Sequence, residues 1–438
     1  MTKGLKIATI GGGSSYTPEI VEGFINKKLA GELPLTDLYL VDVPAGKDKL
    51  EIVGTLAKRM VEKANANINI HLTYDRREAL KDADFVTTQF RVGLLDARIK
   101  DEKIPLKYNL IGQETNGPGG FAKALRTIPV ILDICKDMAE LCPNAWLINF
   151  TNPSGMVTEA VLKHTNIKVL GLCNVPLGMK QMVADMYGVE MERIYIEFAG
   201  LNHFVWGRKI LLDGLDVTAE VLDALVKGEI VGTMKNMPDA EWNVDLLKDL
   251  KMLPCGYHRY YYMRNDALEK VLKESADKGV RAEVVKGVEE ELFELYKDPN
   301  LAEKPEQLSK RGGAHYSDAA VNLIAAIYND KRDIHVVNVR NNGTMSDLPD
   351  NVSIECNCVV TRDGAKPLAI GKLPIGARGM LQMQKAFEEL AIEAAVTGNY
   401  ATALHAMTIN PLVGDSKLAK AVLDDLIEAH KEYLPQFK

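Results

Sequence analysis

Several features that mark other classes of protein are absent from this chain of 438 residues. No apolar run is long enough to span a bilayer, and no apolar signal-peptide segment follows the N-terminal methionine. Basic residues are scattered and the formal net charge is −7, which argues against a nucleic-acid partner. Only six cysteines occur, and without an export signal we expect them to be reduced thiols. The sequence therefore predicts a cytoplasmic protein with no membrane or nucleic-acid partner.

Aromatic residues are also few, at 6% of the chain, but hydrophobic residues reach 47% and charged residues 26%. These proportions are typical of a globular protein that buries a sizeable core. A chain of this length is expected to form two domains. We predict an α/β fold, with a Rossmann-like, doubly wound parallel sheet that binds NAD in residues 1–196. An α+β domain for substrate binding, catalysis and oligomerisation is expected in residues 197–438.

Short apolar runs give the positions of the expected parallel strands. They are Ile7–Ile10, Leu38–Val41, Phe85–Thr88, Ala145–Phe150 and Val169–Leu172. Helical patterns such as Asp48–Lys63 and Pro176–Met186 lie between them, as is typical of strands joined by crossover helices. Pro129 interrupts the pattern Lys123–Leu141, so we expect that helix to kink or to begin near Thr127.

Polar residues recur where these strands end. The carboxyl ends carry Gly11–Ser14, Asp42, Thr88–Arg91, Asn149–Asn152, and Cys173 with Asn174. Ligands of parallel α/β sheets bind at this edge. We therefore expect the functional site there.

The first strand runs directly into a glycine cluster and a helix start. The expected dinucleotide-binding residues are Gly11, Gly12, Gly13, Ser14 and Asp42. Glycines let the backbone approach a pyrophosphate, and a helix N-terminus favours its negative charge. Tyr16 occupies the third position of the G-x-G-x-x-G pattern, so a tight turn without a ligand is the alternative. Asp42 would bind the ribose hydroxyls and repel a 2′-phosphate, which favours NAD over NADP.

A cysteine and a histidine form the expected metal pair. Cys173 lies in GLCNVP directly after a strand, and His203 lies in GLNHF. A thiolate and an imidazole both bind divalent transition metals. Core packing of either residue is an alternative, as is a hydrolase that uses the cysteine as its nucleophile.

Two further segments carry chemistry. Tyrosines and basic residues are concentrated in Leu253–Tyr262, where a tyrosine beside cations or a metal would have a lowered pKa and act as a base. The glycine-rich loop Ile111–Gly120 contains one carboxylate, Glu114, and would bring backbone and charge over a ligand. An aromatic strand or interface and a surface turn are the respective alternatives.

Together these segments resemble the family 4 glycoside hydrolases, an NAD-dependent group. The matching motifs are GGGSSYTP near the N-terminus, RVGLLDARIKDE (Arg91–Glu102), GQETNGPGG (Gly112–Gly120), NFTNPSG (Asn149–Gly155), GLCNVP, GLNHF and PCGYHRYYY. Asn174, directly after the cysteine, resembles the branch that acts on 6-phospho-β-glucosides. The branch that acts on 6-phospho-α-glucosides has an aspartate there as proton donor, a role that an amide cannot fill.

The resemblance implies a redox-assisted elimination. NAD⁺ would take a hydride from C3 of the sugar, and a divalent metal, Mn²⁺ or a related ion, would bind to Cys173 and His203. Tyr257 would then remove the acidified C2 proton, and Glu114 would raise the basicity of that tyrosine. Tyr261 is the alternative base. After the aglycone leaves from C1, water adds and the hydride returns, so there is no net redox change.

The resemblance also implies a phosphorylated substrate. It places Arg98, Asn152, Asn174 and Arg281 in contact with that substrate. The expected reaction converts a 6-phospho-β-glucoside, such as cellobiose 6-phosphate or an aryl glucoside, to glucose 6-phosphate and an aglycone. Because the family forms dimers or tetramers, we expect a homo-oligomer.

Three other functions stay open from the sequence. The N-terminal pattern also suits an NAD-dependent 2-hydroxy-acid dehydrogenase, which would produce NADH and need no metal. A family 4 enzyme for a non-phosphorylated galactoside or galacturonide is the second alternative. A nucleotide-binding regulator without activity is the third, and the presence of Cys173, His203, Tyr257 and Glu114 argues against it.

Overall fold

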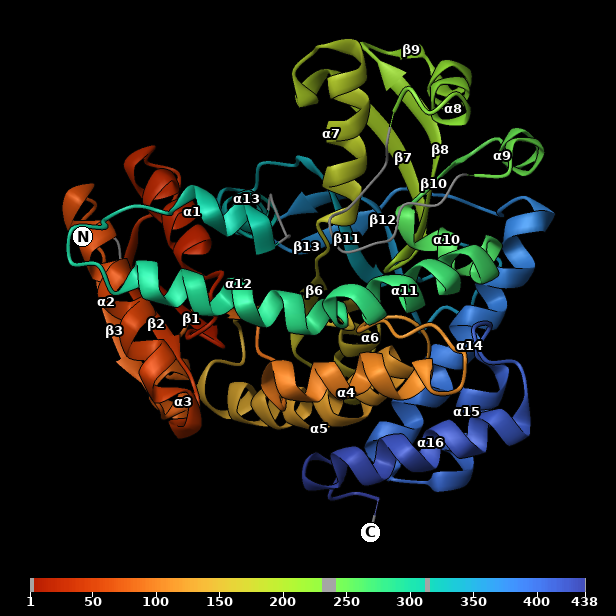
Figure 1. Ribbon diagram of the computed structural model, residues 1–438. Helices are drawn as coiled ribbons and strands as arrows, with labels where there is room; N and C mark the ends of the chain where they lie inside the picture. The colour runs from red at the N-terminus through yellow and green to blue at the C-terminus, as the bar shows by residue number, and fades with distance from the viewer. Residues whose placement is uncertain (1–3, 231–241, 312–315, 438) are drawn as a thin grey trace.

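Residues 4–230, 242–311 and 316–437 are described by the computed structural model of this chain (Figure 1). The strands are β1 (Leu5–Ile10), β2 (Leu35–Val41), β3 (Asn69–Thr73), β4 (Phe85–Thr88), β5 (Trp146–Asn149), β6 (Lys168–Gly171), β7 (Ile194–Leu201), β8 (Phe204–Leu212), β9 (Leu215–Asp216), β10 (Leu253–Pro254), β11 (Ile334–Arg340), β12 (Ser353–Thr361) and β13 (Gly364–Pro367). They form one 13-stranded sheet with the order β10-β8-β7-β12-β11-β6-β5-β4-β1-β2-β3. β13 pairs with β12, and β9 pairs with β8.

The N-terminal half of this sheet is parallel. Its order, β3-β2-β1-β4-β5-β6, is that of a doubly wound dinucleotide-binding sheet. The predicted Rossmann-like α/β fold is therefore confirmed, and all five predicted parallel strands are present. The sequence did not predict β3, because Asn69–Thr73 lies at the sheet edge and mixes polar with partly buried apolar residues.

Helices cover both faces of the sheet (Figure 1). They are α1 (Thr17–Leu29), α2 (Lys47–Lys63), α3 (Arg76–Leu80), α4 (Leu94–Leu106), α5 (Gly117–Leu141), α6 (Ser154–His164), α7 (Val175–Tyr187), α8 (Thr218–Val226), α9 (Val244–Leu250), α10 (Arg259–Tyr262), α11 (Arg264–Lys278), α12 (Arg281–Tyr296), α13 (Tyr316–Asn329), α14 (Ile375–Thr397), α15 (Tyr400–Ile409) and α16 (Ser416–His430). Ile7 faces a core shared with α1, α2 and α13, whereas Ala8 faces a second core shared with α5, α6 and α14. Successive strand residues thus point to opposite layers. None of the helices in the described ranges is long and apolar enough to cross a membrane.

Helix α5 differs from the sequence prediction. It begins at Gly117 and continues through Pro129, so the expected start near Thr127 is wrong. Proline in a helix interior costs about 3 kcal/mol or more. Leu125, Ile128 and Ile131 on this helix are fully or almost fully buried, and their packing on the sheet offsets that cost.

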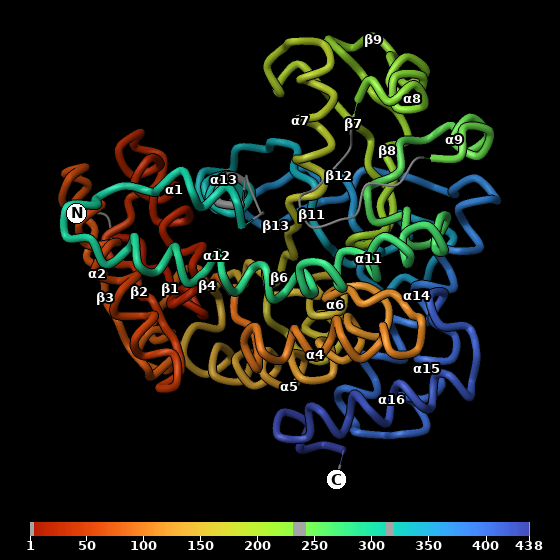
Figure 2. Tube along the Cα trace, in the orientation of Figure 1, coloured from red at the N-terminus to blue at the C-terminus, as the bar shows by residue number. Residues whose placement is uncertain are grey.

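The later strands extend the same sheet in antiparallel pairing. β11 joins the edge of β6, β12 follows β11, and β7 and β8 lie beyond them. The trace in Figure 2 shows β11 and β12, late in the chain, lying next to the much earlier β6. Two late strands therefore separate β6 from β7, the strands that precede Cys173 and His203.

Candidate active site

The glycine cluster after β1 forms a tight turn against the end of β2. The N–H groups of Gly11 and Gly12 both donate to the carbonyl oxygen of Val41, at 2.9 and 2.8 Å. A Cβ on Gly12 would lie 2.8 Å from the Cα of Leu40, and Gly11 has a φ of +90°. The turn therefore requires glycine and presents bare backbone at the carboxyl edge of the sheet, as a pyrophosphate site does.

Asp42 packs against this turn. Its Oδ2 accepts a hydrogen bond from the N–H of Gly13 at 2.9 Å, and its Oδ1 accepts one from the N–H of Val43 at 2.8 Å. Burial raises the pKa of Asp42, although both N–H groups oppose that shift. Ser14 closes the turn by donating from its N–H to Gly11 O at 3.1 Å. The carboxylate lies where this fold binds a ribose.

A groove of about 750 Å³ opens beside the turn, between α2, α4 and α12. Ile52, Leu94 and Phe293 give it apolar walls. Glu289, also on the wall, accepts a hydrogen bond at 3.3 Å from the hydroxyl of Ser15, which follows the glycine turn.

Cys173, His203 and Tyr257 are brought together from three parts of the chain. Cys173 follows β6, and His203 lies in the tight turn between β7 and β8, where its φ is +59°. The rings of His203 and Tyr257 are stacked, with centroids 4.1 Å apart and an interplanar angle of 13°. Burial raises the pKa of Tyr257 well above its ordinary value, and the neighbouring Cys173 adds to that rise. The structure thus brings Tyr257 to His203 and Cys173, but burial raises the pKa of Tyr257, opposite to the lowered pKa expected from the sequence.

The imidazole of His203 is buried and oriented by Thr115. Its Nδ1 lies 3.0 Å from Thr115 Oγ1, and that hydroxyl donates to Gln113 Oε1 at 2.9 Å. In the tautomer whose Nδ1–H donates to Thr115, the lone pair lies on Nε2. Burial lowers the pKa of His203 to about 3, so the ring is neutral. A neutral imidazole held by a second hydrogen bond is the form that binds a metal.

The Cys173 thiol is buried near Tyr257. It accepts from the N–H of Val175 at 3.4 Å and is hydrogen-bonded to the side chain of Asn202. Burial and the charge of Glu355 raise the pKa of this thiol well above its ordinary value. Within the described residues, no three His, Cys, Asp or Glu side chains form a metal-binding group. Cys173 and His203 offer one thiol and one imidazole, which are donor groups that divalent transition metals accept.

Glu114 is surrounded by three cations. Its Oε2 pairs with Arg91 and lies 2.9 Å from Lys123 Nζ, and its Oε1 lies 3.1 Å from Arg98 Nη1. Arg91 and Arg98 hold the pKa of Glu114 well below its ordinary value despite burial. Burial, and then repulsion by Arg91, lower the pKa of Lys123 to about 7. Glu114 thus stays anionic, and its charge raises the pKa of Tyr257.

The predicted substrate arginines are linked through one carboxylate. Glu102 Oε1 accepts from Arg98 Nε at 2.7 Å, and Glu102 Oε2 accepts at 2.7 Å from the N–H of Ala282, next to Arg281 at the start of α12. Burial, and then the charge of Arg98, lower the pKa of Arg281. Two guanidinium groups therefore lie near each other in a partly desolvated place.

The predicted substrate asparagines lie at the ends of neighbouring parallel strands. Asn152 follows β5, and its Oδ1 accepts from the N–H of Ser154 at 3.3 Å. Asn174 follows β6 and is the N-cap residue of α7. Because β5 and β6 are paired in parallel, both asparagines lie at the carboxyl edge that carries Cys173.

Comparison with known proteins gives two adjacent family matches. The model described as family 4 glycosyl hydrolase matches residues 6–189, and that of the family 4 glycosyl hydrolase C-terminal domain matches residues 198–413. The chain belongs to the family 4 glycosyl hydrolases. The resemblance found in the sequence is thereby confirmed.

Individual family 4 relatives match over the whole chain. A Bacillus subtilis (strain 168) protein named probable 6-phospho-beta-glucosidase is 64% identical over 438 residues, which cover 100% of this chain and 99% of the relative. An Escherichia coli (strain K12) 6-phospho-beta-glucosidase is 47% identical, with 100% and 98% covered. The 6-phospho-beta glucosidase of Thermotoga maritima, solved with manganese, NAD+ and glucose-6-phosphate, has a TM-score of 0.87 at 35% identity and covers 98% of this chain and 99% of its own.

Several residues of this family 4 site were not predicted from the sequence. Lys123 and Thr115 are examples: a lysine in a helical pattern suggests solvent exposure, and a threonine in a loop carries no distinctive signal. Only the charge of Lys123, which with Arg126 interrupts the otherwise apolar start of α5, could have pointed to a partner. Tyr261, the alternative base, accepts from Asn116 Nδ2 at 2.9 Å and donates to Gln384 Oε1 at 3.3 Å, so its hydroxyl is engaged away from His203.

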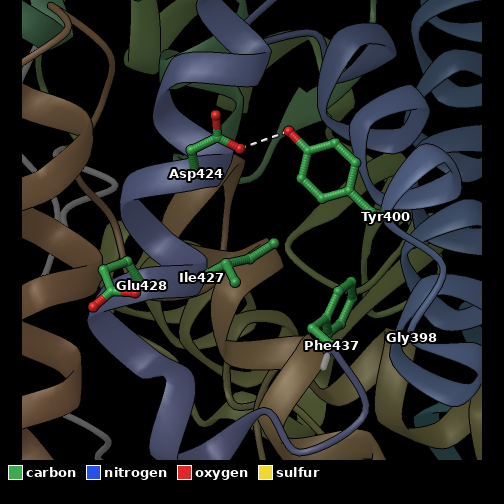
Figure 3. A pocket seen from close by; sticks show the side chains of 6 residues that line it. All are labelled: Gly398, Tyr400, Asp424, Ile427, Glu428 and Phe437. Atoms are coloured by element: carbon green, nitrogen blue, oxygen red, sulfur yellow. Dashed lines mark hydrogen bonds between the residues drawn. The ribbon is translucent and has the colours of Figure 1, made fainter.

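A second pocket, of about 350 Å³, lies apart from the active site of this family 4 chain (Figure 3). It is lined by Gly398, Tyr400, Asp424, Ile427, Glu428 and Phe437, from α15, α16 and the segments that flank them. The Tyr400 hydroxyl donates to Asp424 Oδ1 at 2.6 Å across it. It shares no residue with the site of Cys173 and His203.

Proposed function

We propose that this family 4 chain hydrolyses 6-phospho-β-glucosides to glucose 6-phosphate and an aglycone, using NAD⁺ and a divalent metal such as Mn²⁺. The observation that carries this proposal is the stack of Tyr257 on His203 beside Cys173. The names of the relatives at 64% and 47% identity support the substrate class, and the ligands of the Thermotoga maritima structure support the cofactors.

The cofactors and the protein side chains contribute different parts of the proposed reaction. When bound, NAD⁺ supplies a reversible hydride acceptor for C3 of the sugar, and the metal supplies a Lewis acid for the C2 and C3 oxygens. Tyr257 removes the proton from C2. Burial and the charge of Glu114 raise the pKa of Tyr257, so a metal bound beside it would have to stabilise the phenolate for Tyr257 to act as the base. The raised proton affinity would then favour proton uptake. Cys173 and His203 hold the metal, and the turn Gly11–Ser14 with Asp42 holds NAD⁺.

The state of Glu114 supports elimination over two-carboxylate hydrolysis. An ordinary glycosidase needs one carboxylic acid as proton donor and a second carboxylate as nucleophile or base. Glu114 stays ionised because Arg91 and Arg98 hold its pKa well below the ordinary value, so it cannot donate a proton. Its oxygens are engaged by three cations, so it is also a poor nucleophile.

The basic residues near Glu114 suit the phosphate of the substrate. We assign Arg98, Arg281 and Asn152 to the sugar phosphate, since guanidinium groups bind phosphate oxygens in bidentate fashion. Asn174 contacts the sugar near the scissile bond. Its amide cannot act as a proton donor, which favours the β over the α substrate.

Location, assembly and domain division belong to the same proposal. We place the enzyme in the cytoplasm, where phosphorylated disaccharides arise by transport-coupled phosphorylation. Ile375 and Met383 on α14 are 79% and 48% exposed, and such apolar side chains favour a homodimer or homotetramer. The gap between the two family matches, at residues 190–197, supports a division into residues 1–196 and 197–438.

The test is hydrolysis of p-nitrophenyl-β-D-glucoside 6-phosphate by chelated, cofactor-depleted enzyme. Activity that returns only when NAD⁺ and Mn²⁺ are both restored, without net NADH, is the expected result. Hydrolysis that depends on neither NAD⁺ nor Mn²⁺ would contradict the proposal and make Cys173 a candidate nucleophile. NADH formation from a 2-hydroxy acid, without hydrolysis, would favour the dehydrogenase alternative. The α-linked substrate and the unphosphorylated β-galactoside serve as specificity controls.

A further inference from the structure

Four residues form a row across the sheet directly behind the candidate metal ligands. Gly171 on β6 is opposite Asn338 on β11, Asn338 is opposite Glu355 on β12, and Glu355 is opposite Gly200 on β7. Cys173 follows the first member of this row by two residues, and His203 follows the last by three. The row therefore spans the gap between the two loops that carry the ligands.

The two inner members of the row are polar and fully buried. Asn338 and Glu355 both have 0% exposed side chains. Glu355 Oε1 accepts hydrogen bonds from Asn338 Nδ2 at 2.9 Å and from Asn202 Nδ2 at 3.3 Å. Asn202 is the residue before His203, and its side chain also bonds to the Cys173 thiol. One carboxylate oxygen is thus connected through Asn202 to both ligand loops.

The outer members of the row are glycines at crowded positions. A Cβ on Gly171 would lie 2.2 Å from Thr158 Oγ1 and 2.8 Å from the Cβ of Asn338, and one on Gly200 would lie 2.3 Å from the carbonyl oxygen of Phe204. Because Gly171 pairs with Asn338 and Gly200 pairs with Glu355, both ligand loops start within a few residues of the buried pair.

Core packing alone does not explain the carboxyl group. Among the described residues, Glu355 Oε2 and Asn338 Oδ1 are buried without a hydrogen-bond partner. Burying an unpaired polar oxygen costs free energy that a leucine or methionine would not. Such groups are retained where they serve a site.

We propose that Glu355, supported by Asn338 and acting through Asn202, is a positioning residue that holds the Cys173 and His203 loops at the separation a divalent metal requires. It does not enter the coordination sphere. This inference rests on the proposed metal site, since its role is to orient the ligands of that site. Outer partners of metal ligands fix ligand orientation in this way, and their loss typically weakens metal binding by roughly 10- to 100-fold.

The experiment measures Mn²⁺ binding by the electron paramagnetic resonance signal of free Mn²⁺, and NAD⁺ binding by quenching of tryptophan fluorescence. Glu355→Leu removes the acceptor oxygen and should weaken Mn²⁺ binding by roughly 10- to 100-fold, with NAD⁺ affinity unchanged. Glu355→Gln keeps an acceptor oxygen and should bind Mn²⁺ as the wild type does. If Glu355→Leu does not fold, Asn202→Leu cuts the same connection and should give the same loss.

The matched control is Asn357→Leu, which removes another buried polar residue from the same face of β12. Asn357 ties β12 to β7 by accepting from the N–H of Phe198 at 2.7 Å and donating to Ile196 O at 3.0 Å, farther from the ligand loops. It should lower stability and leave Mn²⁺ affinity unchanged. Wild-type Mn²⁺ affinity in Glu355→Leu, or equal losses in Asn357→Leu or Glu355→Gln, would overturn the inference. Cys173→Ser tests the site itself: if it binds Mn²⁺ normally, the proposed metal site fails instead.

Discussion

The imidazole of His203 lies against the ring of Tyr257, with the two ring planes within 13° of parallel. Thr115 connects the same pair, because it accepts from His203 Nδ1 and is hydrogen-bonded to the Tyr257 hydroxyl. A proposed metal ligand and the proposed base are therefore held by the same hydroxyl group. This coupling fixes where a proton can be taken relative to the metal.

The first prediction concerns Tyr257→Phe. Removing the phenolic oxygen removes the base and should lower kcat by roughly 10²- to 10⁴-fold, the usual contribution of a positioned acid or base. The ring stack is kept, so the affinities for NAD⁺ and Mn²⁺ should not change. Steady-state kinetics with the p-nitrophenyl substrate measure the effect. The control is Tyr260→Phe, which should retain activity; the ring centroids of Tyr260 and Tyr257 are 6.2 Å apart. Equal losses of kcat in both variants would count against Tyr257 as the base.

The second prediction concerns Glu114→Gln. This change leaves Arg91, Arg98 and Lys123 without their shared anion in a buried place. Loss of one partner of a buried ion pair costs about 3 to 5 kcal/mol, and the free energy of unfolding from urea titration should fall by about that amount. The exposed pair Lys63–Glu303 gives the control, since Glu303→Gln should cost less than about 1 kcal/mol. If Glu114→Gln lowers the free energy of unfolding by a similarly small amount, Glu114 does not stabilise Arg91, Arg98 and Lys123 as described.

The third prediction follows from Lys123. Its pKa is lowered to about 7 because the side chain is buried and lies near Arg91, so at pH 8 most molecules carry a neutral amine. A phosphate dianion bound at Arg98 and Arg281 stabilises the protonated form and raises this pKa. Glucose 6-phosphate binding at pH 8 should therefore take up protons. Calorimetric titration in two buffers of different ionisation enthalpy measures the proton uptake, and Lys123→Met should abolish it. If the binding heat of the wild type is the same in both buffers, no proton is taken up and the prediction is wrong.

The fourth prediction concerns the pH dependence of metal binding. The pKa of Cys173 is raised well above its ordinary value, so the metal-free protein carries a thiol at neutral pH. A metal binds the thiolate and releases that proton, so below the thiol pKa the Mn²⁺ association constant should rise about tenfold per pH unit. Cys173→Ser should bind Mn²⁺ weakly and without this slope. A wild-type affinity that is constant with pH would mean that the thiol is not a ligand.

The parallel half of the sheet could be predicted from local patterns. Phe85–Thr88 is an apolar run of the predicted length, and polar residues follow it directly. Because all strands of a parallel sheet end at the same edge, these polar residues can be placed together without any knowledge of tertiary contacts. Gly11–Ser14, Asp42 and Asn174 were predicted as site residues in this way.

The rest of the sheet and of the candidate site depends on pairing between distant segments of the chain. No local signal in Ile334–Arg340 or Ser353–Thr361 indicates that these strands insert between β6 and β7. Without that insertion, neither the row containing Glu355 nor the meeting of Cys173 with His203 can be derived. The cations around Glu114 come from a loop and two helices, so their burial is likewise a property of the tertiary structure.

The most direct test of the central claim is the fate of hydrogen at C2 during hydrolysis in D₂O. The substrate p-nitrophenyl-β-D-glucoside 6-phosphate is turned over by enzyme with NAD⁺ and Mn²⁺, and the glucose 6-phosphate formed at early times is analysed by proton NMR. Removal of the C2 proton by Tyr257 followed by return of a solvent proton predicts deuterium at C2 of the product. A product that retains its original hydrogen at C2 would contradict elimination at this site and require direct displacement at C1.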